Sequence, residues 1–247
     1  MSDEKSKRLQ LTLWDVQKRM GQQTLGTLSS LTRADDSIPI ATGFEGLDHV
    51  LGVGGIPRGQ MTELLGIPTS GMTTLAHKMM ASVHTAQGIT AYIDFSHSFD
   101  PDYAVRCGVV LNRLLVVRPN TMTQALDIAR DLFREAKLDL VLLDLITEQD
   151  ASSRTLETVF KRLHEPLTKS RSAAVLLRFA SKQSIRQMID EYIYLRLLVE
   201  WEDWLYEQHD VRGYRIQLTV LKHKSQPGER QIHFDITFDD VVKGDGA

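Results

Sequence analysis

Cysteine is nearly absent from this sequence. Cys107 is the single cysteine among 247 residues, so no disulfide can form within the chain. A metal site built from several cysteine ligands is excluded for the same reason. This composition fits a reducing compartment, and we expect the protein in the cytoplasm.

Long apolar runs are also missing. No stretch approaches the roughly 20 consecutive apolar residues that a membrane-spanning helix needs. The segment from Met1 to Arg19 is polar and charged and has no apolar signal core. We therefore expect a soluble protein without a targeting segment or a membrane partner.

Charge shows no strong excess of one sign. The formal net charge is -3, with 29 Lys and Arg residues against 32 Asp and Glu residues. This balance supplies no global attraction to nucleic acid, so contact with a polyanion would have to come from local patches.

The sequence does contain an alternation of strand and helix patterns. Strands are expected over 61–65, 90–94, 114–117, 138–143 and 173–178, and helices over 73–85, 101–107, 123–134 and 154–168. Near-continuous apolar runs such as Leu138 to Leu143 are typical of strands buried on both faces. The fold class is therefore α/β, with a mostly parallel sheet flanked by helices.

The two ends of the chain differ from this central pattern. Strands without long intervening helices are expected over 194–204, 212–222 and 231–238, which predicts an antiparallel extension of the sheet. Apolar residues at helical spacing from Leu9 to Met20 predict a separate helix. We divide the chain into an N-terminal helix and linker, 1–37, and a core domain, 38–247.

A glycine-bounded loop follows the first predicted strand. Residues 66–74 read Gly-Ile-Pro-Thr-Ser-Gly-Met-Thr-Thr and have the frame of the G-x-x-x-x-G-K-[ST] phosphate loop, with Met72 in place of the lysine. Its backbone N–H groups and the following helix N-terminus are expected to face an anion. The candidate nucleotide site consists of Gly66, Thr69, Ser70, Gly71, Met72, Thr73 and Thr74. The alternative is a plain strand-to-helix turn.

The segments around this loop resemble the RecA family over residues 38–145. The motifs that carry the resemblance are Ala41-Thr42-Gly43, Leu47-Asp48, Leu51-Gly52, Gly54-Gly55, Pro57 and Gly59 before the loop, and Tyr92-Ile93-Asp94, His97, Asp100-Pro101, Tyr103-Ala104 and Gly108-Val109 after it. The resemblance implies a RecA-like nucleotide-binding core and, more weakly, a subunit-linking role for residues 1–37. The short chain also resembles the ImuA-like accessory proteins of damage-induced translesion synthesis.

The resemblance assigns roles to two further positions. Asp144 matches the family's magnesium-binding acid, so Thr73 and Asp144 would hold Mg²⁺; the alternative is an ordinary strand-ending acid. The family's catalytic glutamate, which polarises the attacking water, corresponds to Ser96, and a serine lacks that basicity. With Met72 and Ser96 at these positions, we expect no catalytic residues and only weak binding of ATP and Mg²⁺.

Ile216, Leu218 and Val220 alternate on one face of the strand predicted over 212–222, and Lys222 and Lys224 continue the same spacing. Continued alternation would place both lysines on the face of these residues, about 7 Å apart. A corresponding pair in the RecA family reaches across the subunit interface to the neighbour's nucleotide, so the resemblance implies the same for these two. The alternative is a solvated strand end.

Signals for macromolecular contacts are local. The segments that correspond to the family's two DNA-holding loops are short, and Lys182 and Arg186 are the candidates for phosphate contacts or, alternatively, simply solvated charges. Residues 200–207 combine tryptophans with acids on a predicted hairpin. They either pack on the core or form a protein-binding edge.

Three functions fit these features. We favour a RecA-like accessory protein in DNA repair, recombination or translesion synthesis, which acts through RecA-family subunits, its own or a paralogue's, or through a repair polymerase. The second is an ATP-dependent recombinase on single-stranded DNA, with Lys78 or Arg58 in the role of the missing lysine. The third is a non-enzymatic regulator of cell division or signalling on the same fold.

Overall fold

One sheet of nine strands organises the described part of the chain. The computed structural model describes residues 38–135, 137–145, 153–180, 188–226, 228–237 and 243–244. The strands are β1 (Met61–Gly66), β2 (Thr90–Asp94), β3 (Leu114–Val117), β4 (Leu140–Asp144), β5 (Ala173–Phe179), β6 (Ile193–Glu207), β7 (Asp210–His223), β8 (Arg230–Thr237) and β9 (Lys243–Gly244). Their order across the sheet is β3-β2-β4-β5-β1-β6-β7-β8-β9.

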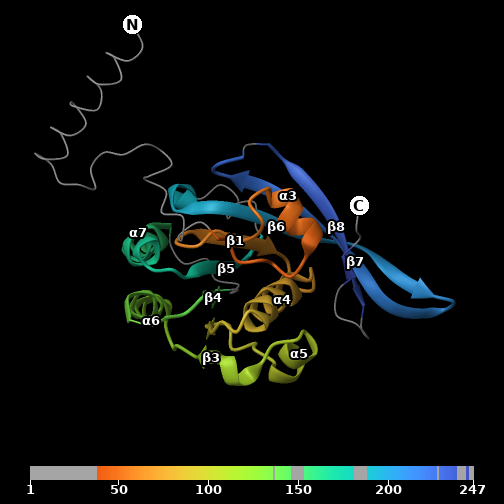
Figure 1. Cartoon of the computed structure of the whole chain (residues 1–247), viewed down its shortest axis with the longest axis horizontal. Coiled ribbons are helices and arrows are strands. Elements are labelled where there is room, and N and C mark those ends of the chain that lie inside the picture. Colours follow the sequence, from red (N-terminus) through yellow and green to blue (C-terminus); the bar gives the residue numbers. More distant parts are fainter. Residues whose placement is uncertain are drawn as a thin grey trace, which may run out of the picture. The chain divides into compact units, whose positions relative to one another are not determined.

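Helices cover both faces of this sheet (Figure 1). They are α3 (Glu45–Leu51), α4 (Met72–Thr85), α5 (Pro101–Arg106), α6 (Met122–Glu135) and α7 (Ser153–Lys169), with the 3-10 helices η1 (Leu111–Arg113) and η3 (Met188–Glu191). Helices α3, α4 and α5 contribute to one hydrophobic core, and α6 and α7 contribute to a second core on the opposite face. Among the described residues, no helix is both long enough and apolar enough to cross a membrane.

The central strands are buried along their whole length because each serves both cores. Every residue of β1, β2 and β4 is buried. In β4, Leu140 and Leu142 belong to the core of α4, whereas Val141 and Leu143 belong to the core of α6 and α7. Pairing is parallel from β3 to β6, so the α/β prediction with a mostly parallel sheet is confirmed.

The C-terminal strands extend the sheet in antiparallel pairs, as predicted. β6 pairs with β1 through residue Val199 and, beyond it, with β7 alone. The joined ends of β6 and β7 project away from the helices in Figure 1. This outer hairpin exposes Trp201, Trp204 and Tyr206.

Predicted and observed boundaries differ by a few residues. The strand predicted from Leu138 begins at Leu140 instead, because Asp139 has a loop role. Its carboxylate accepts a hydrogen bond from the Ile89 N–H (3.1 Å) and pairs with Arg58 (3.1 Å). The predicted N-terminal helix, Lys182 and Arg186 lie outside the described residues.

Candidate functional site

The glycine loop lies at the carboxyl end of β1, in the middle of the sheet. Gly66 is paired with Phe179 of β5 on one side and with Val199 of β6 on the other. The Ala180 N–H donates to the Gly66 carbonyl (2.9 Å), which fixes the start of the loop. Helix α4 begins directly after the loop, at Met72. The predicted strand, loop and helix are therefore in place.

Both glycines of the loop are closely packed, and Gly71 also has a left-handed backbone conformation. Gly71 has a φ of +89°, and an added Cβ would stand 2.8 Å from Cδ1 of Ile236. At Gly66 an added Cβ would stand 2.4 Å from Oγ of Ser70. The loop therefore presents backbone where other residues would present side chains.

This loop has the features of an anion cradle. The N–H groups in the first turn of α4 lack acceptors within the helix, and the helix dipole favours negative charge there. Ser70 Oγ is buried and has no hydrogen-bond partner among the described residues. Because an unpaired buried hydroxyl is unfavourable, a phosphate oxygen at this loop would supply an acceptor that the protein does not. The residues present therefore fit the phosphate group of a nucleotide.

Met72 is part of the hydrophobic core. Its side chain is 3% exposed and belongs to the core that α3, α4 and α5 form on the sheet. A lysine confined to this place would bury its ammonium group among apolar side chains. The cradle therefore has no cation at the position that contacts the terminal phosphates in a complete phosphate loop.

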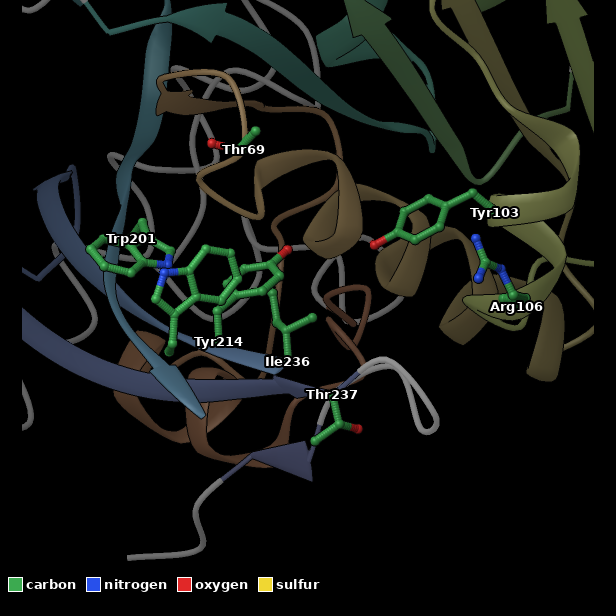
Figure 2. A pocket seen from close by; sticks show the side chains of 8 residues that line it. Thr69, Tyr103, Arg106, Trp201, Tyr214, Ile236 and Thr237 are labelled. Atoms are coloured by element: carbon green, nitrogen blue, oxygen red, sulfur yellow. The ribbon is translucent and has the colours of Figure 1, made fainter. Parts of the chain in front are cut away.

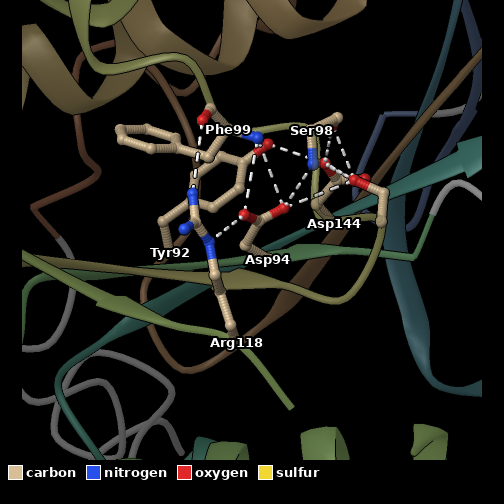
Figure 3. Close-up of polar contacts among 7 residues, drawn as sticks. Tyr92, Asp94, Ser98, Phe99, Arg118 and Asp144 are labelled. Carbon is tan, nitrogen blue, oxygen red and sulfur yellow. Dashed lines mark hydrogen bonds and ion pairs between the residues drawn. The ribbon is translucent and has the colours of Figure 1, made fainter. Parts of the chain in front are cut away.

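The carboxylate of Asp144 is held by hydroxyl groups (Figure 3). Its Oδ2 accepts hydrogen bonds from the Tyr92 hydroxyl (2.8 Å) and from Ser96 Oγ (2.7 Å). Ser98 Oγ lies 3.2 Å from the same oxygen and 2.6 Å from Ser96 Oγ, and its single proton serves one of them. Burial, followed by the charge of Asp144, raises the pKa of Tyr92, which keeps this residue a neutral donor.

Asp94 fixes the loop that carries the two serines. Its Oδ1 accepts the N–H groups of Ser98 (2.9 Å) and Phe99 (3.4 Å), and Arg118 Nε donates to its Oδ2 (2.9 Å). Asp94 is also paired with Asp144 in the register of β2 and β4. These contacts hold the Ser98 hydroxyl close to the acid, as Figure 3 shows.

Oδ2 of Asp144, the acid at the end of β4, fits hydrated Mg²⁺ poorly. Mg²⁺ usually keeps several of its water molecules, and an acid that supports it accepts hydrogen bonds from those waters. Oδ2 of Asp144 already accepts hydrogen bonds from hydroxyl groups of the protein, at the positions where metal-bound waters would donate. The binding of Mg²⁺ by Thr73 and Asp144 stays a prediction, and the contacts on Oδ2 argue against it.

A pocket of about 660 Å³ opens beside the loop (Figure 2). It is lined by Thr69, Tyr103, Arg106, Trp201, Trp204, Tyr214, Ile236 and Thr237. The ring centroids of Trp201 and Trp204 are 5.7 Å apart, and those of Trp204 and Tyr214 are 6.2 Å apart, both edge to face. Aromatic walls next to a phosphate cradle suit a flat heterocyclic base.

Helix α4 connects the loop to this pocket. Thr74 Oγ1 and the Tyr103 hydroxyl are 2.5 Å apart. His77, on the same helix, is 1% exposed and packs against the rings of Tyr92, Phe99 and Tyr103. Neither of its ring nitrogens has a hydrogen-bond partner among the described residues, and burial lowers its pKa to about 4. The helix therefore carries a neutral, apolar-packed histidine between the pocket and Asp144.

The prediction that Lys222 lies on the same strand face as Val220 was wrong. Val220 pairs with Leu197, but Lys222 pairs with Arg196, so β7 has one extra residue between them. This bulge reverses the alternation, and His223 lies on the buried side instead of Lys222.

Both predicted lysines nevertheless reach the same structural element. Lys222 Nζ donates to the carbonyl of Asp190, and Lys224 Nζ donates to the carbonyl of Glu191 (2.6 Å), both in η3 of the same chain. Burial lowers the pKa of Lys222. Their action on a neighbour's nucleotide stays a prediction.

Sequence reasoning missed a buried group of charges under η3. Glu63 of β1 is fully buried and pairs with Arg178 of β5 (2.7 Å) and Arg196 of β6 (2.5 Å). Arg196 also pairs with Asp190 (2.6 Å). A signal was present, because an acid inside an apolar strand is rarely buried unless it is paired.

The fold and the loop together define the protein's class. A parallel sheet with a glycine-bounded loop at the carboxyl end of a central strand is the framework of P-loop nucleotide-binding proteins. The sequence model of the protein family "RecA N-terminal domain" matches residues 7–154 of the chain. The RecA proteins of Herpetosiphon aurantiacus and Chloroflexus aurantiacus are each 30% identical to the chain over its whole length and are themselves covered to 75% and 78%. The chain belongs to the RecA family, whose role at the family level lies in DNA recombination and repair.

Proposed function

We propose that this protein is an accessory member of the RecA family that hydrolyses little or no ATP and acts through protein partners. The observation that carries the proposal is the replacement of both catalytic groups. Met72 is packed into the core where a lysine would face the phosphates. Ser96 donates to Asp144 where a glutamate would activate water.

The two replacements affect different parts of phosphoryl transfer. A lysine stabilises charge that develops on the phosphates, and a glutamate removes a proton from the attacking water. Neither Met72 nor Ser96 can do this chemistry, so restoring one of them leaves the other step unsupported. Nucleotide binding, by contrast, requires only the cradle and the pocket.

The partners that we propose are RecA-family subunits, from this chain or a paralogue, or a repair polymerase, in the cytoplasm of a bacterium. Lys222 and Lys224 would contact a neighbour's nucleotide after release from the η3 carbonyls. Single-stranded DNA is a further candidate, through Lys182 and Arg186. Damage-induced translesion synthesis is the more specific process to which such an accessory role belongs.

A recombinase with a relocated lysine is less well supported. Arg58 precedes β1, whose six residues span about 20 Å, and the loop follows the far end of that strand. Its guanidinium donates to the Arg171 carbonyl (2.7 Å) and pairs with Asp139. Lys78 lies six residues beyond Met72, which is about 9 Å along α4. No contact among the described residues supports the third alternative, a regulator of cell division or signalling.

The test has two parts, hydrolysis and association. Phosphate release from ATP is measured for the purified chain with Mg²⁺ and single-stranded DNA, beside its Asp144→Ala variant. We expect the same background rate for both proteins. DNA-stimulated release that Asp144→Ala abolishes would favour the recombinase instead.

Association is measured by mixing the full chain with the RecA recombinase of the same cell, and separately with its repair polymerase. We expect a complex with at least one of them by analytical ultracentrifugation. Absence of both complexes, with and without nucleotide, counts against the accessory role.

A further inference from the structure

We propose that the pocket binds its nucleotide without Mg²⁺ and that a third phosphate adds no affinity. The ligand class is then an aromatic base that carries one or two phosphates. This inference rests on the proposed function, because it specifies the ligand of a site that does not hydrolyse ATP.

The first argument concerns the metal. Asp144 Oδ2 accepts hydrogen bonds from Tyr92 and Ser96, and Ser98 Oγ lies within 3.2 Å. The waters bound to Mg²⁺ could donate hydrogen bonds to Oδ2 only if they displaced these hydroxyl groups. The serines are themselves held in place, because Asp94 accepts the Ser98 N–H (2.9 Å). Metal binding through Oδ2 of Asp144 therefore competes with contacts of the protein itself.

The second argument concerns charge. Without the lysine, the cradle of a single chain attracts phosphate through the N-terminus of α4, which is equivalent to about half a positive charge. Among the described residues that line the pocket, Arg106 alone carries a positive charge, and its guanidinium lies 5.3 Å from the Tyr103 ring centre. A monophosphate carries about 1.5 to 2 negative charges at pH 7, and each further phosphate adds to this. One or two phosphates match the available charge better than three.

The third argument explains why binding persists despite these losses. Trp201, Trp204, Tyr103 and Tyr214 provide aromatic surface around the pocket (Figure 2). Stacking of one base on an aromatic side chain is worth about 5- to 150-fold in affinity. The base rather than the terminal phosphates would then supply most of the affinity.

The experiment is calorimetric titration of the full chain with AMP, ADP and ATP, each in saturating Mg²⁺ and in EDTA. We expect the Kd of each nucleotide in the two buffers to agree within about twofold, and ATP to bind no more tightly than ADP. An increase in affinity of about tenfold with Mg²⁺, or from ADP to ATP, overturns the proposal. A failure of all three nucleotides to bind also overturns it, while the accessory function stands.

Variants test the part of the hydroxyl groups. The double variant Ser96→Ala/Ser98→Ala removes two of the three hydroxyl groups around Asp144 Oδ2 and leaves only the Tyr92 bond. We expect ATP binding by this variant to become about tenfold tighter with Mg²⁺ than in EDTA. Adding Asp144→Asn should remove that gain, and Ser225→Ala, on a serine outside the site, should not produce it. A double variant that stays indifferent to Mg²⁺ contradicts the assignment of metal exclusion to these hydroxyls.

The pocket has its own pair of variants on one hairpin. Trp201→Ala should weaken ADP binding by about tenfold, whereas Tyr206→Ala, on a residue outside the pocket lining, should not change it. Equal affinities for the two variants place the base elsewhere and overturn the proposal. DNA-stimulated ATP hydrolysis is a separate result, which contradicts the proposed function itself.

Discussion

The Tyr92 hydroxyl donates a hydrogen bond of 2.8 Å to Oδ2 of Asp144, across the paired strands β2 and β4. Both residues are buried. A buried carboxylate needs such donors to remain charged at low cost, so the bond stabilises the fold. The same bond occupies a position that a metal-bound water would use. One contact therefore serves stability and works against catalysis.

Replacing this donor should destabilise the protein. Tyr92→Phe removes a hydrogen bond to a buried charged group, and we expect the free energy of unfolding to fall by about 1.5 to 3 kcal/mol. Urea denaturation measures the change. Tyr206→Phe is the matched control, because this hydroxyl is on a side chain that is 64% exposed. Equal effects of the two variants would show that the Tyr92 bond is not stabilising.

Restoring the lysine should not restore the enzyme. Met72→Lys places an ammonium group where the native side chain packs in the core, so we expect a loss of about 1 to 3 kcal/mol in the free energy of unfolding. We also expect no ATP hydrolysis above background, because Ser96 still lacks basicity. Met72→Leu, which conserves volume, should lose less than about 1.5 kcal/mol. ATP hydrolysis by the Met72→Lys variant would show that the serine at position 96 does not prevent catalysis.

Substitution of a buried charged residue under η3 should destabilise the protein more than substitution of an exposed one. Glu63→Gln leaves Arg178 and Arg196 buried without their shared carboxylate, and we expect a loss of about 3 to 5 kcal/mol in the free energy of unfolding. Glu165→Gln breaks an exposed pair with Lys169 (2.6 Å) and should leave the free energy of unfolding nearly unchanged, because water screens this pair. Chemical denaturation compares the two, and a similar small loss in both would contradict a structural role for Glu63.

His77 should make stability depend on pH. Its pKa is about 4 in the folded protein, lowered by burial from the ordinary 6.5. Between these values the unfolded chain binds a proton that the folded protein does not. The contribution of His77 is therefore complete above pH 6.5 and is lost as the pH falls toward 4, in total about 3 kcal/mol.

The measurement is urea denaturation at pH 7 and pH 5. When the pH falls from 7 to 5, the free energy of unfolding of His77→Leu should decrease by about 2 kcal/mol less than that of the native protein. His49→Gln, on an exposed histidine, should follow the native protein. An unchanged pH dependence in His77→Leu would mean that this histidine does not govern the acid sensitivity.

Much of the fold follows from local patterns in the sequence. The strands predicted over 90–94 and 114–117 have the observed limits, because short apolar runs between turn residues leave little choice of boundary. The loop at 66–74 was predicted for a similar local reason, since it is bounded by two glycines, of which Gly71 has a φ of +89° that other residues rarely adopt. Lys222 shows where local reasoning fails, because alternation along β7 ends at a bulge that depends on its pairing with β6.

By itself, the sequence determined the order of strands and helices, the position of the loop and the loss of the lysine at Met72, since each depends on neighbouring residues. The tertiary structure decided what surrounds the loop. Parallel pairing brings Tyr92 and Ser96 to Asp144, and the antiparallel strands bring Trp201 and Tyr214 to the pocket beside Thr69. These residues are far apart in the chain, so their contacts depend on strand order and register, which no local pattern contains.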